Sequence, residues 1–165
     1  MKRRYFLISC FLFLISYSIS AQVNRPKLVV GLVVDQMRWD YLYRYHDMYG
    51  ANGFKRLLNE GFSCENTMIP YAPPVTGAGH TCIYTGSVPA INGIVANDWI
   101  ERETGMRMYC ASDSTVRPVG SASLWEGQMS PRNMLTNSIA DELRLATNFR
   151  SKTIGIALKD RGGIF

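Results

Sequence analysis

The apolar run from Leu28 to Val34 constrains the fold more than any other segment of this 165-residue chain. Its residues form a nearly continuous apolar series rich in β-branched valine, without the alternation of polar and apolar residues found in a strand that has one face in water. Such a run is typical of a strand buried on both faces of a parallel sheet. A second run of this kind spans residues 152–158. Both runs predict an α/β protein.

The sequence between these two runs predicts helices and turns. Aromatic residues in 39–49, followed by residues 54–60 and the glycine at Gly61, indicate helical turns that stop at a glycine. The other expected elements are a weak strand (62–69), a short helix (76–84), loops with short strands (86–128) and a helix (130–147). The order of strands and helices predicts a mostly parallel sheet flanked by helices.

The first 21 residues have the organisation of a secretory signal peptide: a basic start, an apolar run and small residues before Gln22. Their apolar run, from Tyr5 to Ile19, is shorter than the roughly 20 residues that cross a bilayer. We expect cleavage after Ala21, which leaves residues 22–165 as a periplasmic or secreted domain with no stable membrane anchor. Without the three basic residues of the leader, the formal net charge falls from +5 to +2, so a nucleic-acid partner is not expected.

The cysteines give no support for a structural metal site. Cys64, Cys82 and Cys110 remain after the leader, and an odd number allows at most one internal disulfide. None of them has a CxxC partner or a histidine at the spacing of a zinc site. We expect them to be small side chains that are buried or half-buried.

Polar side chains follow the predicted strands at the edge of the sheet where ligands bind in open α/β folds. Asp35 follows the first run, and its carboxylate could bind a metal ion or orient a base. Thr76 begins a predicted helix, where free N–H groups attract an anion, and its hydroxyl could attack phosphorus if a base or metal ion activates it. Lys159 and Arg161 follow the last run, and in an extended chain both would face one side and could hold a phosphoryl group.

Each of these residues also has a structural interpretation that is common by itself. Asp35 could be a surface residue, Thr76 a plain N-cap, and Lys159 with Arg161 a solvated charge cluster. Together they favour phosphoryl transfer. His80 lies four residues after Thr76, but one helical turn carries its ring about 6 Å along the axis, so a packed, hydrogen-bonded histidine is favoured over a general base.

Four stretches of the sequence closely resemble the periplasmic, phosphate-irrepressible alkaline phosphatases that use threonine as nucleophile. They are residues 26–41, with Val34-Asp35-Gln36-Met37-Arg38-Trp39-Asp40-Tyr41, and residues 75–81, 93–99 and 158–161. The resemblance implies an alkaline-phosphatase-like fold and a two-zinc site at which phosphate monoesters are hydrolysed through a phosphothreonine. It also implies that Asp35 and Thr76 bind zinc, that Thr76 is the nucleophile, and that Asn97, Lys159 and Arg161 contact the phosphoryl oxygens.

The chain departs from this family in length. Members are several times longer and carry their remaining zinc ligands beyond the point that corresponds to Phe165. Residues 22–165 are therefore expected to be the N-terminal part of the catalytic domain, incomplete at the C-terminus and inactive alone.

Other functions remain open at this point. One is a phosphodiesterase or nucleotide pyrophosphatase of the same superfamily, and another is a truncated secreted domain without catalysis. A sulfatase is excluded because no Cys or Ser begins the motif C/S-x-P-x-R, and a P-loop kinase is excluded because Gly77-Ala78-Gly79 lacks the following Gly-Lys-Ser/Thr.

Overall fold

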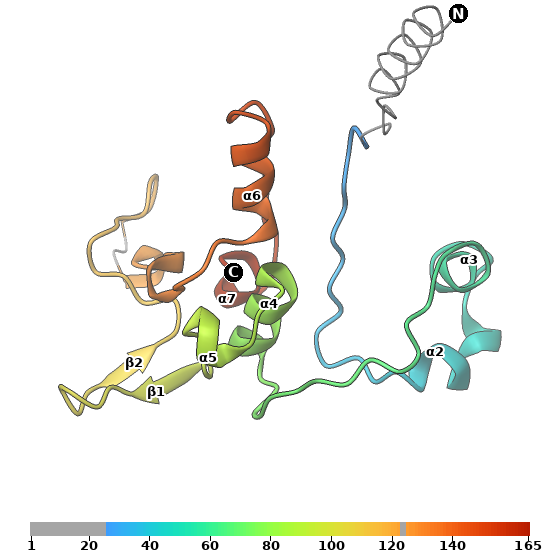
Figure 1. The fold of residues 1–165 in the computed structure, drawn as a ribbon, viewed down its shortest axis with the longest axis horizontal. Helices are drawn as coiled ribbons and strands as arrows, with labels where there is room; N and C mark the ends of the chain where they lie inside the picture. Colours follow the sequence, from blue (N-terminus) through green and yellow to red (C-terminus); the bar gives the residue numbers. More distant parts are fainter. Residues whose placement is uncertain (1–25, 123–124) are drawn as a thin grey trace, which may run out of the picture. The chain divides into compact units, whose positions relative to one another are not determined.

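The computed structural model describes residues 26–122 and 125–165 (Figure 1). The predicted signal peptide, residues 1–21, lies outside the described residues. The chain divides into two units, Met1–Leu32 and Val33–Phe165, and all of the described helices and strands belong to the second unit. No helix in the described part of the chain combines the length and the apolar character needed to cross a membrane.

Helices form where the sequence predicts them in the first half of the second unit. The predicted turns between residues 39 and 60 fold as α2 (Tyr41–Arg44), the 3-10 helix η1 (His46–Met48) and α3 (Phe54–Glu60), which ends at Gly61 as expected. The next helix, α4, spans Thr76–Thr85 and ends at Gly86, whose φ of +65° is the left-handed conformation that glycine adopts without strain. The short α5 (Pro89–Asn92) follows, with proline at its first position.

The region expected to hold loops and short strands contains a β-hairpin. Strand β1 (Asp98–Ile100) pairs antiparallel with β2 (Arg107–Tyr109), and Asp98 lies opposite Tyr109 in the register. A 3-10 helix, η2 (Trp125–Gly127), comes later in the same region.

None of the segments 28–34, 62–69 and 152–158, which are predicted to be strands, has strand structure. Among the described residues the hairpin is the one sheet of two or more strands, and these three runs belong to no strand. Their apolar side chains stay in solvent: Leu28 is 78% exposed and Ile156 is 91% exposed. An apolar run becomes a buried strand only when neighbouring strands satisfy its backbone groups and helices cover its faces, and the described residues supply neither.

The helix predicted over 130–147 is divided in two. The Ser130 hydroxyl caps only the 3-10 helix η3 (Pro131–Asn133), and Leu135 then leaves the helical path because its N–H donates to the carbonyl of Asn92, at 2.9 Å. The α-helix α6 (Ile139–Ala146) begins after Ser138 with a complete capping box. The second cap therefore sets the start of the helix.

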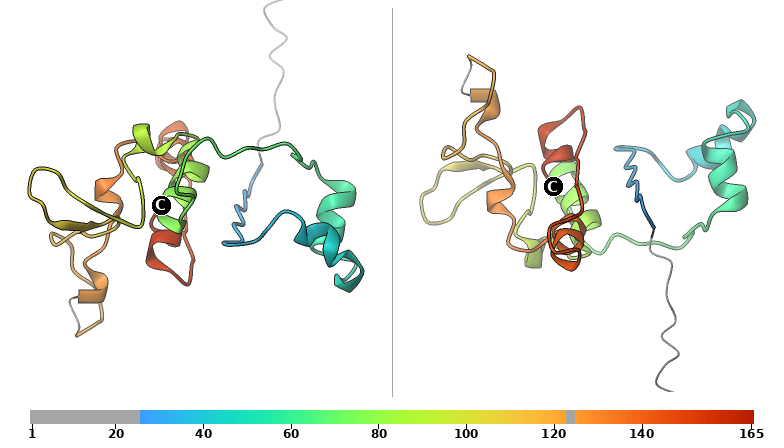
Figure 2. Two further views of the ribbon diagram at one scale, coloured as in Figure 1. Left: turned by 90° about the horizontal axis from the view of Figure 1, so that it is seen from below. Right: turned by 90° about the horizontal axis from the view of Figure 1, so that it is seen from above.

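A small core joins the hairpin to the C-terminal end of the chain. Ile94, Cys110, Ala111 and Phe165 are buried together, with Trp99, Tyr109, Met129, Met134 and Ile164 packed around them. Helix α4 packs against α5, α6 and the last helix, α7 (Asp160–Gly163). Both views in Figure 2 show the green α4 and the red α7 side by side. This packing brings the starts of α4 and α7 into one region.

Candidate active site

Asp35 and Thr76 meet at the start of α4. Asp35 lies in the turn that follows the run 28–34, and Thr76 is the first residue of α4, preceded by Val75 as the N-cap. The Thr76 hydroxyl donates a hydrogen bond to Asp35 Oδ2 at 3.2 Å. The interpretation of Thr76 as a plain N-cap is therefore wrong, because its hydroxyl caps no backbone N–H and instead faces a carboxylate 41 residues away in the sequence.

Lys159 binds the same carboxylate oxygen. Its ammonium nitrogen Nζ lies 2.9 Å from Asp35 Oδ2, and both side chains are partly exposed. The hydrogen bond from Lys159 is the main cause that lowers the pKa of Asp35; the Thr76 hydroxyl lowers it further, while partial burial acts in the opposite direction. Asp35 is therefore ionised at neutral pH, and it holds a hydroxyl and a cation side by side.

Asn97 contacts the same helix start through Gly77. Its Oδ1 accepts a hydrogen bond from the Gly77 N–H at 2.8 Å, so its Nδ2 group is the part of the amide that can donate to a ligand. A Cβ atom on Gly77 would lie 3.2 Å from the Ala96 carbonyl oxygen and 3.3 Å from Asn97 Oδ1. Any larger residue would require these neighbours to shift, and nothing in the spacing of residues 77 and 97 predicts the close approach.

Arg161 points to a different partner from Lys159. Its Nη1 donates to the Tyr109 hydroxyl oxygen at 2.9 Å, and that hydroxyl donates in turn to Asp160. The prediction that Lys159 and Arg161 face one side of an extended chain is wrong, because Lys159 is the N-cap of α7 and the backbone turns helical at Asp160. Successive helical residues rotate by about 100°, which separates the two cations.

Tyr109 is a site residue that no sequence pattern indicates. It ends β2 and lies 52 residues before Arg161 in the chain. Burial and the acceptor Asp160 raise its pKa, so its hydroxyl keeps its proton and remains a donor.

His80 and the buried cysteine are structural. His80 is 8% exposed, and its Nδ1 lies 2.8 Å from the Thr76 carbonyl oxygen, which confirms a packed, hydrogen-bonded histidine. Cys64, Cys82 and Cys110 are free thiols. Burial raises the pKa of Cys110 to about 11, whereas Cys64 is exposed, contrary to the expectation of burial.

The described residues do not form a zinc site by themselves. Zinc usually takes four ligands in a tetrahedron, and Asp35 with Thr76 offers two oxygens. Within residues 26–122 and 125–165, no group of three or more His, Cys, Asp or Glu side chains is close enough to hold a metal ion. Lys159 also occupies one of the two oxygens of Asp35.

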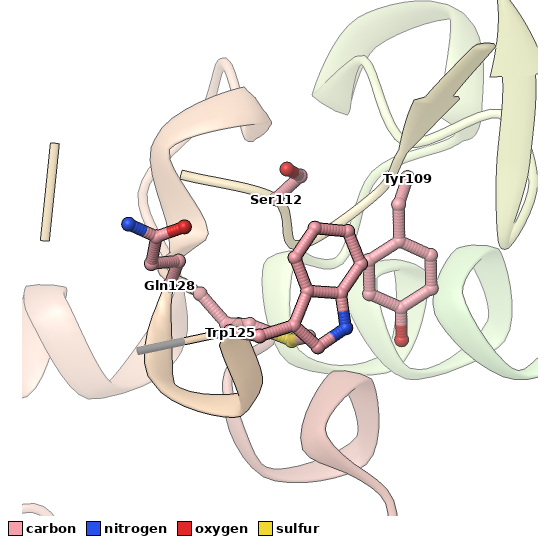
Figure 3. Close-up of a pocket in the computed structure, with 5 residues that line it drawn as sticks. Tyr109, Ser112, Trp125 and Gln128 are labelled. Atoms are coloured by element: carbon pink, nitrogen blue, oxygen red, sulfur yellow. The ribbon is translucent and has the colours of Figure 1, made fainter. Parts of the chain in front are cut away.

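A hollow of about 280 Å³ lies beside the hairpin (Figure 3). Its lining consists of Tyr109, Ser112, Trp125, Gln128 and Met129. The Tyr109 side chain extends from β2 and its ring lies beside Trp125, with the hydroxyl pointing away from the β2 backbone. None of the five predicted site residues lines this hollow.

Residues 29–157 match the sequence model of the type I phosphodiesterase / nucleotide pyrophosphatase family. Two curated relatives are each 62% identical: a protein named calcium-transporting ATPase from Myroides odoratus, over 94% of this chain and 28% of the relative, and alkaline phosphatase PhoV from Synechococcus elongatus, over 86% and 26%. This chain therefore spans about a quarter of the length of these relatives.

The structure is similar to the crystal structure of the wild-type alkaline phosphatase PafA, with a TM-score of 0.83 and 61% identity over 85% of this chain and 27% of that one. A variant of PafA has also been solved, with serine in place of a threonine and alanine in place of an asparagine, a lysine and an arginine. These four positions follow one another at intervals of 21, 62 and 2 residues.

Proposed function

The chain belongs to the type I phosphodiesterase / nucleotide pyrophosphatase family, and on this basis we propose that the whole protein hydrolyses phosphate monoesters, with the Thr76 hydroxyl as the nucleophile. One observation carries the proposal: the Thr76 hydroxyl and the Lys159 ammonium lie 3.2 and 2.9 Å from the same oxygen of Asp35. A nucleophile and a cation for the phosphoryl group are thus held together at the start of a ten-residue helix.

The relatives support the same reading. The likeness to PafA shows that the chain has an alkaline-phosphatase-like α/β fold, although the parallel pairing of its apolar runs is not formed among the described residues. Thr76, Asn97, Lys159 and Arg161 follow one another at 21, 62 and 2 residues, the same intervals and residue types as the four positions substituted in the PafA variant. This agreement favours a shared set of phosphoryl contacts.

The proposed reaction has two steps at phosphorus. In the first step the Thr76 oxygen attacks, a new P–O bond forms, and the ester P–O bond breaks to release the alcohol. In the second step water attacks the phosphothreonine, which releases inorganic phosphate and restores the hydroxyl. Asp35 is a poor base because of its lowered pKa, so its role toward Thr76 is to orient the hydroxyl.

Three side chains would stabilise the charge on the phosphoryl oxygens. Lys159 supplies a point charge next to the nucleophile, and Asn97 supplies its Nδ2 donor because Gly77 already occupies its oxygen. Arg161 supplies the guanidinium donors that Tyr109 leaves free. A monoester fits this set best, because its terminal phosphoryl group carries more negative charge than that of a diester.

The hydroxyl of threonine needs an activator, and in the whole protein we propose two zinc ions. Zinc would lower the pKa of the bound hydroxyl and polarise the phosphoryl group. Asp35 and Thr76 would each give one oxygen ligand. The other ligands would come from outside the described residues, so we propose that residues 22–165 are inactive when expressed alone.

A second candidate function is phosphodiester or phosphate-anhydride hydrolysis. The family's description names phosphodiesterases and pyrophosphatases, and one relative is named as an ATPase. The same threonine chemistry serves these substrates, so the position of Thr76 does not separate them. The number of cationic contacts favours a dianionic phosphoryl group over the monoanion of a diester, and the comparison of substrates separates a monoester from an anhydride.

The test compares substrates and nucleophile variants in the full-length protein. We expect faster hydrolysis of 4-nitrophenyl phosphate than of bis(4-nitrophenyl) phosphate or ATP, loss of activity with a chelator, and recovery with zinc. Thr76→Ala should abolish hydrolysis, whereas Thr76→Ser, which keeps a hydroxyl, should retain part of it. Hydrolysis by Thr76→Ala at the wild-type rate would overturn the proposal, and a preference for the diester or for ATP would establish the second candidate.

We also propose that the protein is exported to the periplasm or secreted. The signal-peptide pattern of residues 1–21 supports this location. N-terminal sequencing of the exported protein should begin at Gln22, and a mature chain that retains Met1 in the cytoplasm would contradict the proposal.

A further inference from the structure

We propose that Tyr109 is a positioning residue that keeps Arg161 available for the phosphoryl group by holding it apart from Asp160. This role rests on the proposed function, because it assumes that Arg161 meets an anionic ligand. The Arg161 Nη1 group donates to the Tyr109 hydroxyl oxygen at 2.9 Å, and the Arg161 Cζ atom lies 5.9 Å from the centre of the Tyr109 ring. Tyr109 thus contacts the guanidinium of Arg161 in two ways: its hydroxyl accepts a hydrogen bond, and the guanidinium carbon lies over its ring.

Tyr109 is itself held firmly. Its hydroxyl donates to the Asp160 carboxylate, at 2.7 Å from Oδ2 and 2.9 Å from Oδ1, and its ring packs against the small core. A phenol has one proton to donate and two lone pairs. Because the proton goes to Asp160, the oxygen accepts from Arg161, and both partners are used without conflict.

The hydroxyl of Tyr109 bonds to both charged groups and lies between them. Asp160 and Arg161 form only a long ion pair, because Arg161 Nη1 lies 3.9 Å from Asp160 Oδ1, beyond the distance of a hydrogen bond. With the hydroxyl removed, Arg161 would close on Asp160 and form a charge-assisted pair. That pair would neutralise the cation that the phosphoryl group needs.

The position of Tyr109 is tied to the rest of the site through its neighbour. The Cys110 N–H donates to the Asn97 carbonyl at 2.9 Å, and a Cβ on Gly77 would lie 3.2 Å from Cys110 Sγ. The strand end that carries Tyr109 is therefore fixed to the start of α4, beside the nucleophile. The β1–β2 hairpin positions the Tyr109 hydroxyl, and this hydroxyl in turn positions the Arg161 guanidinium.

The experiment uses the Tyr109→Phe variant of the full-length protein. We expect kcat/KM for 4-nitrophenyl phosphate to fall by about ten- to a hundredfold, the effect of losing one hydrogen bond to a charged group. The dissociation constant of inorganic phosphate, measured by calorimetry, should rise in the same proportion. A merely structural role would lower the active fraction and leave this dissociation constant unchanged.

Two double variants test whether Tyr109 acts through Arg161 and Asp160. In Arg161→Ala protein, adding Tyr109→Phe should change kcat/KM by less than about twofold, because the positioned group is gone. In Asp160→Ala protein, Tyr109→Phe should have a smaller effect than in the wild type, because Arg161 then has no neighbouring carboxylate on which to close. The matched control is Tyr43→Phe, which removes a hydroxyl that donates to Glu65 at an exposed position and should leave both measurements unchanged.

The outcomes separate this inference from the proposed function. The inference is overturned if Tyr109→Phe binds phosphate and turns over substrate like the wild type, if it keeps its full effect without Arg161, or if the wild type binds no phosphate. The proposed function fails if Thr76→Ala remains fully active. In that case weaker phosphate binding by Tyr109→Phe, absent in the Arg161→Ala background, would still support the role of Tyr109.

Discussion

Replacing Gly77 by alanine is expected to destabilise the protein, although alanine is normally the better helix former. Gly77 is the second residue of α4 and is buried. An added Cβ would lie 3.2 Å from the Ala96 carbonyl oxygen, 3.2 Å from Cys110 Sγ and 3.3 Å from Asn97 Oδ1. Three neighbours would have to move, and one of them is a backbone oxygen.

The expected size follows from two opposing effects. Alanine in place of glycine stabilises a helix by about 1 kcal/mol. Overfilling a well-packed region costs about 1–3 kcal/mol. The net change for Gly77→Ala is therefore a loss of about 1 kcal/mol in the free energy of unfolding. Gly79 lies in the same helix with no atom within 4 Å of its added Cβ, so Gly79→Ala should gain about 0.5–1 kcal/mol.

The assay is urea unfolding of the two variants of the full-length protein, monitored by circular dichroism. The value of kcat/KM is measured on the same preparations. The two free energies of unfolding should differ by about 2 kcal/mol, and only Gly77→Ala should lose activity, because its Cβ pushes on Asn97. The reasoning is refuted if the two variants are equally stable, or if Gly77→Ala is stabilised and fully active.

Three other predictions concern caps, acid stability and thiols. Ser138→Ala should lower the free energy of unfolding by about 1 kcal/mol in urea, because it removes the capping box of α6; an unchanged value would contradict the cap. The Ser130 hydroxyl is the main group that holds the pKa of Asp113 well below its ordinary value, so the charged form stabilises the fold above about pH 4 and this stabilisation is lost on acidification. Ser130→Ala should therefore move the acid-unfolding midpoint to higher pH, and a midpoint at the wild-type pH would refute this. In native protein at pH 8, peptide mapping after thiol labelling should find Cys64 modified and Cys110 unmodified, since Cys110 is buried with a pKa raised to about 11; rapid labelling of Cys110 would contradict its burial.

The sequence predicted the parts of the site that depend on local pattern. Asp35 at the end of an apolar run and Thr76 at a helix start are local signals, and the structure brings the two together. Lys159 was predicted because it follows an apolar run, as Asp35 does, and its ammonium group binds the Asp35 carboxylate. The positions along the chain were sufficient because Thr76 and Lys159 lie at the starts of α4 and α7, and Asp35 lies at the end of an apolar run.

The remaining contacts depend on tertiary structure and leave no local signal. Tyr109 reaches Arg161 across 52 residues, and the approach of Gly77 to Asn97 depends on how the hairpin packs against α4. Asn97 itself was found through resemblance, since its sequence context reads as a turn. The common orientation of Lys159 and Arg161 was predicted wrongly because the start of α7 at Asp160 turns the chain from extended to helical.

The fold shows the same division between local and long-range information. Glycine and proline signals located α3 and α4, whereas the helix expected over 130–147 was split by a hydrogen bond from Leu135 to Asn92 that no local pattern reveals. The apolar runs 28–34 and 152–158 predict strands, but pairing requires neighbours that the described residues do not provide. The residue pattern therefore indicates which segments can pair as strands, and the presence of neighbouring segments decides whether they do.

The most direct measurement is an acid quench of the full-length protein during turnover of a phosphate monoester, followed by peptide mass spectrometry. We expect one phosphoryl group on the Thr76 hydroxyl, present in the wild type and absent in Thr76→Ala. A phosphorylated residue elsewhere in the chain, or steady turnover without any phosphorylation of Thr76, would contradict the assignment of this threonine as the nucleophile.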